Sequence, residues 1–229
     1  MRYSVTLERG TDSGYMAWVH ELPGCFARGA TREEVESKIR PAIAEFLSWT
    51  GSGGQGADAV EFSIVAEVGS VTEARNADSE VLLEPDRAAL TPQDWATIER
   101  WLRLSRREVL RALRMTGEAD MDRKPEGSPR SIRGHFVHVG FVEFMYMAWT
   151  FDLHSKEGIA AFLRWTRRLA TARMRTLARS YQSAVTQADW SGAPRPEPWT
   201  PRKAARRLLW HERLHLRAIR RLLARSTKA

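Results

Sequence analysis

The sequence has a single cysteine, Cys25, among its 229 residues. One cysteine excludes a disulfide framework within the chain and a metal cage built from several thiolates. Long apolar runs are also missing, because the most apolar stretch, residues 136–149, is too short to span a bilayer and contains His138 and Glu143. The chain opens on an alternating pattern, without the apolar core of a signal peptide. We therefore expect a cytoplasmic protein that does not cross a membrane.

Lysine is scarce and charge is unevenly distributed. Only 5 of the 36 basic residues are Lys, and the net charge of +8 divides into −7 for residues 1–90 (8 basic, 15 acidic) and +15 for residues 91–229 (28 basic, 13 acidic). This asymmetry favours two domains, for which the chain is long enough. A basic half can indicate nucleic-acid binding. The Arg residues are spread along several helical segments without a recognition motif, so we interpret them as a solvated surface and do not expect nucleic acid as a partner.

The first 70 residues carry the patterns of a small mixed domain. Period-two alternation or short apolar runs bounded by turn residues predict four strands, at residues 2–8, 15–20, 26–28 and 60–65. Between the last two, Thr31 and Glu34 form a capping box that opens a helix with Val35, Ile39 and Ile43 on one face. Pro41 is expected to kink that helix or to begin a second turn of it. The predicted order is β-β-β-α-β.

Three motifs in this segment resemble the HicB family of small antitoxin-like domains: Gly-Tyr-Met-Ala-Trp-Val at 14–19, Glu-Leu-Pro-Gly-Cys at 21–25 and Gly-Ala-Thr-Arg-Glu-Glu-Val at 29–35. The resemblance implies the fold of residues 1–70. Antitoxins of that family bind a small RNase toxin and often carry an added DNA-binding segment, which is not recognisable here. We interpret His20 and Cys25 as structural strand-end residues. Residues 71–90, polar and without periodicity, are expected to be a linker.

Residues 91–229 are predicted to be helical. Thr91-Pro92 and Thr200-Pro201 are N-cap and N1 pairs that begin the first and last helices. Apolar residues at three- and four-residue spacing predict helices at about 91–115, 131–149, 156–181 and from 200 onward. The second of these is apolar on nearly every side, which is typical of a central helix. Residues 182–199 contain three Pro and are expected to be a long loop. An up-down four-helix bundle follows.

The last helix contains a histidine pair at His211 and His215. Residues four apart on a helix are neighbours on one face, so both imidazoles can converge on one zinc or nickel ion. The string from His211 to His215 also spells the HExxH motif of zinc proteases. We rank that interpretation second, because the 14 residues after His215 contain no His, Asp or Glu for a third ligand. The third ligand should therefore lie upstream.

Glu212 falls in the middle of the apolar stripe of the same helix when the residues are placed at 100° intervals. A carboxylate that faces a core must be paired, protonated or near a metal. Two interpretations stay open at this point. Glu212 either serves a metal site, by orienting an imidazole or accepting a proton, or forms a buried ion pair with an Arg of another helix, such as Arg107 or Arg133.

The helical half resembles the DinB-like superfamily. The matching motifs are Ser-Ile-Arg at 131–133, His-Val at 138–139, Glu-Phe-Met-Tyr at 143–146 and Trp-His-Glu-Arg-Leu-His-Leu-Arg-Ala-Ile at 210–219. In that family one His of the second helix and two of the fourth bind a divalent metal, commonly zinc or nickel. The resemblance thus implies His138, His211 and His215 as metal ligands. His135, three residues before His138, is the competing candidate for the first position.

Together these patterns predict an α+β protein of two domains, a HicB-like domain at 1–70 and a DinB-like four-helix bundle at 91–229, joined by a linker at 71–90. The function that the resemblance implies is a metal-dependent enzyme, a hydrolase or a transferase for a low-molecular-weight thiol, with Glu212 as a catalytic residue and a small-molecule substrate. The alternative is a non-catalytic binding module whose HicB-like domain engages a protein partner. We also expect a homodimer, because Trp210 and Leu214 lie on the Arg-rich face of the last helix.

Overall fold

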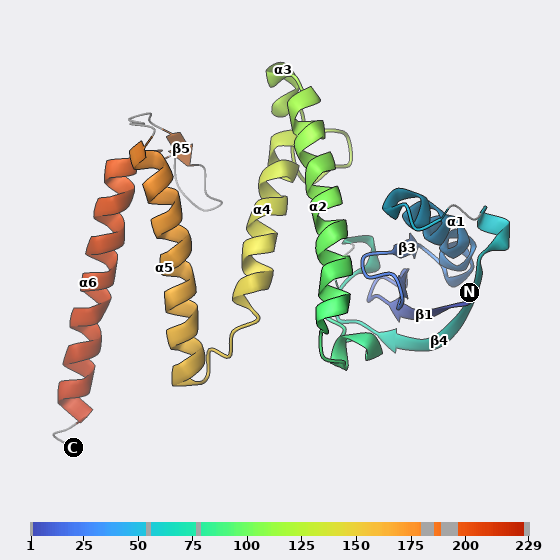
Figure 1. Ribbon diagram of the computed structural model, residues 1–229, viewed down its shortest axis with the longest axis horizontal. Coiled ribbons are helices and arrows are strands. Elements are labelled where there is room, and N and C mark those ends of the chain that lie inside the picture. The colour runs from blue at the N-terminus through green and yellow to red at the C-terminus, as the bar shows by residue number, and fades with distance from the viewer. Residues whose placement is uncertain (1, 54–55, 77–78, 180–185, 189–196, 227–229) are drawn as a thin grey trace. The chain divides into compact units, whose positions relative to one another are not determined.

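The computed structural model describes residues 2–53, 56–76, 79–179, 186–188 and 197–226 (Figure 1). The chain divides into two compact units, Met1–Phe136 and Val137–Ala229. The first contains a four-stranded sheet and the helices that pack with it, and the second contains the long helices that follow.

The sheet of the first unit consists of β1 (Arg2–Arg9), β2 (Tyr15–Val19), β3 (Phe26–Gly29) and β4 (Glu61–Gly69), in the spatial order β3-β2-β1-β4. β2 is antiparallel to both β1 and β3, whereas β1 and β4 are parallel. The helix α1 (Arg32–Thr50) and the short turn η1 (Ala57–Ala59) connect β3 to β4. A parallel pair cannot be closed by a hairpin, and α1 provides the crossover that it needs. The predicted β-β-β-α-β order is confirmed.

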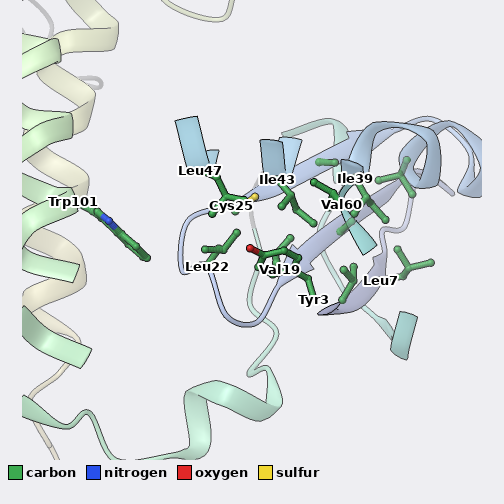
Figure 2. Packing of buried hydrophobic residues seen from close by; sticks show 14 residues of the cluster. Tyr3, Leu7, Val19, Leu22, Cys25, Ile39, Ile43, Leu47, Val60 and Trp101 are labelled. Atoms are coloured by element: carbon green, nitrogen blue, oxygen red, sulfur yellow. The ribbon is translucent and has the colours of Figure 1, made fainter. Parts of the chain in front are cut away.

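The core of this unit lies between α1 and one face of the sheet (Figure 2). Val5 and Leu7 of β1 and Val35, Ile39 and Ile43 of α1 are each at most 1% exposed. Thr31 is the N-cap as predicted, since the N–H of Glu34 donates to Thr31 Oγ1 at 3.2 Å, but the reciprocal bond of the predicted capping box is shifted by one residue. The Glu34 carboxylate accepts from the N–H of the residue before the cap, at 2.7 Å. The helix continues through Pro41 as a single element.

β1 is buried on both faces, in contrast to the half-buried strand that its alternation predicts. Thr6 and Glu8, on the face opposite α1, are 3% and 2% exposed. The Glu8 carboxylate accepts hydrogen bonds from the indole N–H of Trp18 at 2.6 Å and from Ser79 Oγ at 2.7 Å. Ser79 comes from the segment after β4, so residues distant in sequence cover this second face. The apolar–polar alternation of β1 cannot show that a distant segment buries its polar face.

The segment 71–90 contains two short helical turns, η2 (Ala74–Asn76) and η3 (Glu84–Arg87). Its first part is attached to the sheet domain through Asp12, whose carboxylate accepts from the N–H of Ala74 at 3.0 Å and of Arg75 at 3.1 Å. Ala74 is 3% exposed. The domain boundaries that we expect at 70 and 91 stay a prediction, but residues 72–75 make specific contacts with the turn between β1 and β2.

Four long helices appear where the sequence predicts them: α2 (Pro92–Met115), α4 (Ile132–Ala148), α5 (Lys156–Arg179) and α6 (Pro201–Ser226), with the short α3 (Glu118–Met121) after α2. The fold class, a mixed sheet domain followed by a helical region, is confirmed. Within the expected loop 182–199, the described residues form an antiparallel pair of β5 (Thr186–Ala188) and β6 (Glu197–Trp199), and the rest of that loop lies outside the described residues. No helix within the described ranges combines the length and apolarity that crossing a bilayer requires.

α2 packs within the first unit. The ring of Trp101 meets the ring of Phe46 of α1 edge to face, with centroids 5.2 Å apart and an angle of 90°. The indole N–H of Trp49 donates to the carboxylate of Glu108 at 2.9 Å. Edge-to-face aromatic pairs add specific geometry to apolar burial. These contacts join α2 to the sheet domain.

Ile43→Ala is expected to lower the free energy of unfolding of the first unit by about 2–5 kcal/mol, because it leaves a cavity at a fully buried site. Urea unfolding followed by circular dichroism measures the change. The matched control is Val65→Ala at the β4 bulge, where the side chain is 54% exposed and little apolar burial is lost. Equal losses in the two variants would contradict the assignment of the core.

Asp12 makes the attachment of residues 74–75 dependent on pH. The N–H of Arg75, with smaller contributions from those of Ala74 and Gly14, lowers the pKa of Asp12 below its ordinary value of 3.8. The stabilisation is therefore present above that value and is lost as pH falls through the lower pKa of the folded state. We expect the amide NMR signals of Ala74 and Arg75 to shift in this acid range. Asp12→Ala should abolish the titration, and Asp58→Ala should leave it intact.

Candidate functional site

The histidine pair lies on α6, which begins as predicted at Thr200. The N–H of Lys203 donates to Thr200 Oγ1 at 3.1 Å, and no Pro or Gly interrupts the helix after Pro201. The rings of His211 and His215 are adjacent, with centroids 4.5 Å apart at 61°. The four-residue spacing on a helix therefore places two imidazoles where they can share one ligand.

α5 lies beside α6 and runs antiparallel to it (Figure 1). The two helices are joined by an ion pair between the guanidinium of Arg167 and the carboxylate of Glu212. Both side chains are largely exposed, at 48% and 63%, so Glu212 does not occupy the inward position that its place in the apolar stripe predicts. It is paired with an Arg of another helix, and that helix is α5. An exposed pair of this kind contributes about 0–1 kcal/mol.

A groove of about 1290 Å³ lies between α5 and α6. Its apolar lining includes Leu163, Met174, Leu208, Leu216 and Ile219. Its polar lining includes His211, Glu212 and His215 together with five arginines, Arg164, Arg167, Arg168, Arg173 and Arg207. The groove thus combines the histidine pair with apolar and cationic surfaces, as a site for a small organic ligand does.

The third expected ligand, His138, is an exposed residue of α4. Within the described parts of the chain, no three His, Cys, Asp or Glu side chains gather closely enough to hold a metal ion. The competing His135 has its ring Nε2 2.9 Å from Ser128 Oγ. His154 lies outside the helices, in the connection before α5. The structure therefore places His211 and His215 together, and the three-histidine site stays a prediction.

α4 contacts α5 through aromatic residues. The ring of Phe144 stacks on that of Trp165, with centroids 5.2 Å apart and an angle of 21°. Phe151, just after α4, meets Phe162 at 5.7 Å and the same Trp165 at 5.5 Å. α4 has no buried residue, so its predicted position as a central helix stays a prediction.

Sequence reasoning did not single out the arginines of α5. Arg164, Arg167 and Arg168 line the groove beside the histidine pair. Their spacing of three and four residues is the signal that could have found them, because it places all three on adjoining parts of one helix surface. The many Arg of the helical half obscured this signal, because a helix rich in Arg is usually interpreted as having a solvent-exposed face.

Cys25 is buried, and the ring of His20 has another partner. Burial, and secondarily the charge of Glu45, raises the pKa of the Cys25 thiol to about 12. The ring Nε2 of His20 instead lies 2.8 Å from Thr6 Oγ1. A thiol that stays protonated is a poor nucleophile, which supports the structural role that we expect for Cys25; the same role for His20 stays a prediction.

A family model described as the DinB superfamily matches residues 102–219, slightly more than half of the chain. The chain belongs to the DinB superfamily. This match begins within α2 and ends at Ile219, and it includes His138, His211 and His215. The remaining N-terminal part is similar to a different group of proteins.

The N-terminal region of this DinB superfamily member resembles the UPF0150 protein Ta0767 of Thermoplasma acidophilum, which is HicB-like. The two are 36% identical over 47 residues, which cover 20% of this chain and 68% of the relative. No solved structure matches the chain. Both resemblances that the motifs suggest are therefore confirmed at the level of family.

We expect Cys25 to react very slowly with a disulfide reagent such as 5,5′-dithiobis(2-nitrobenzoic acid) at pH 8, because the buried thiol is almost entirely protonated there. In denaturant it should react rapidly and completely, which the absorbance of the released thiolate measures. Cys25→Ser supplies the blank. Fast reaction of the native protein would show that this thiol is accessible and ionised.

Proposed function

We propose that this DinB superfamily protein is a divalent-metal-dependent enzyme, either a hydrolase or a transferase for a low-molecular-weight thiol. The observation that carries the proposal is the adjacency of the His211 and His215 rings, 4.5 Å apart, at the wall of the α5–α6 groove. The family match includes both residues. Zinc or nickel is the expected metal, and His138 is the proposed third ligand.

The donors present fit this group of metals. Neutral imidazole is a preferred ligand of zinc and nickel, and catalytic zinc sites commonly use three protein ligands and keep one position open. The adjacent rings of α6 can fill two positions. His138 would supply the third from α4, a helix that reaches α5 through Phe144 and Trp165.

When bound, such a metal acts as a Lewis acid and favours the deprotonated form of a water or a small thiol near neutral pH. The other contributions come from side chains of the groove. Arg167 holds the carboxylate of Glu212 beside the histidine pair, where it can accept a proton from the incoming nucleophile. Apolar residues such as Leu208 and Leu216 would hold the apolar part of a substrate and displace water.

A non-catalytic binding module is the second candidate. The observation that favours it is that no third donor accompanies His211 and His215 among the described residues. In that case the HicB-like domain would engage a protein partner and the helical region would be a scaffold. The enzyme requires a metal, whereas the scaffold could be metallated or not, so a protein that binds no metal would leave only the binding module.

We expect about one zinc or nickel ion per chain in protein purified without a histidine tag or chelator, as a three-histidine site predicts. Elemental analysis measures the content. His211→Ala, His215→Ala and His138→Ala should each lose most of the metal while the far-ultraviolet circular dichroism stays helical. His154→Ala, which removes a His in the connection before α5, is the matched control and should keep it.

A wild-type protein that is free of metal and cannot be reconstituted with either ion would overturn the enzyme proposal in favour of the binding module. Retention of metal in His138→Ala combined with its loss in His135→Ala would reassign the third ligand. Equal loss in His154→Ala would mean that the metal is not held by the proposed residues.

A further inference from the structure

The polar lining of the α5–α6 groove is strongly cationic. Among the residues that the structure describes, five arginines line it, and Glu212 is the one acidic residue there. Two of the five have partners, because Arg167 pairs with Glu212 and the guanidinium of Arg207 lies over the ring of Trp210, 4.8 Å from its centroid. The remaining three guanidinium groups carry charge that this acid does not balance.

Arg164, Arg168 and Arg173 form no ion pair with any residue that the structure describes. Arg164 and Arg168 are four residues apart on α5, a spacing at which like charges destabilise a helix. Both line the same groove as the apolar side chains and the histidine pair. An anion in the groove would relieve this repulsion and would receive charge-assisted hydrogen bonds from planar, multidentate donors.

The rest of the groove lining is mainly aliphatic, which suits the apolar part of a ligand. Leu163 and Met174 of α5 and Leu208, Leu216 and Ile219 of α6 lie in the same groove as the arginines. Its volume of about 1290 Å³ is sufficient for a small organic molecule. A nucleic acid fits these features less well, because it meets proteins through a polyanionic backbone and gains little from an aliphatic lining.

We infer that the α5–α6 groove binds an amphipathic anion. Its carboxylate or phosphate group would be bound by Arg164 and Arg168, which are four residues apart on one face of α5, and its apolar body would lie against the leucines and Met174. The inference rests on the proposed function in one respect, since it names the class of substrate that the enzyme would present to the histidine pair. Binding of the anion itself requires no metal.

Octyl phosphate is a suitable probe, used below its micelle-forming concentration with the full-length, chelator-treated protein in a calorimetric titration. Two further titrations separate the contributions: inorganic phosphate has the charge without the chain, and octyl glucoside has the chain without the charge. We expect octyl phosphate to bind at least about tenfold more tightly than either, because both parts of the groove contribute.

Arg164→Gln with Arg168→Gln should weaken octyl phosphate binding by about tenfold or more, the effect expected when charge-assisted bonds are removed. The matched control, Arg175→Gln with Arg202→Gln, makes the same change in net charge at exposed positions of α5 and α6 outside the groove. It should leave the dissociation constant within about twofold, since exposed charges at a distance are screened.

Equal weakening in the two double variants would overturn the inference, because binding would then follow overall charge. So would octyl glucoside binding as tightly as octyl phosphate, or displacement of octyl phosphate by duplex DNA at equal phosphate concentration. Metal content and anion binding of the wild-type protein, measured separately, distinguish this inference from the proposed function. Retained metal without any selective anion binding in the wild type overturns the inference alone, and selective anion binding by a protein without metal overturns the enzyme proposal alone.

Discussion

The burial of α1 against one face of the four-stranded sheet is the interaction on which the first unit depends. Leu7, Ile39 and Ile43, three side chains of this contact, are at most 1% exposed. The parallel pairing of β1 with β4 requires the crossover that α1 provides. Apolar burial on this scale is the dominant favourable term in folding. The second face of β1 is then closed by Ser79 and Trp18 around Glu8.

The same helix connects the two families of sequence in this chain. α1 belongs to the HicB-like region, and its Phe46 meets Trp101 of α2 edge to face. The DinB superfamily match begins at residue 102, the next position along α2. The start of the helical region is therefore packed on the sheet domain rather than attached through a free linker, and an aromatic contact of this geometry constrains the angle at which α2 meets α1.

In the second unit, the residues of the proposed site line a groove between two antiparallel helices, α5 and α6. α6 supplies the histidine pair and Arg207, and α5 supplies the other four arginines of the described lining. Arg167 connects the two helices. It pairs with Glu212, which lies between His211 and His215 in the sequence, and it lines the groove with Arg164 and Arg168. Metal binding and anion binding would thus use opposite walls of one groove, which is the arrangement that brings a charged substrate to a Lewis acid.

The sequence by itself determined the local features, because capping, periodicity and residue spacing act over a few positions. It predicted the β-β-β-α-β order, the starts of α1, α2 and α6, and the adjacency of His211 and His215. Only the tertiary structure decided what long-range packing controls: the burial of Glu8 by Ser79, the attachment of residues 74–75 to Asp12, and the pairing of Glu212 with Arg167. These contacts join residues from 45 to 71 positions apart, and no short-range pattern encodes which distant side chain will arrive.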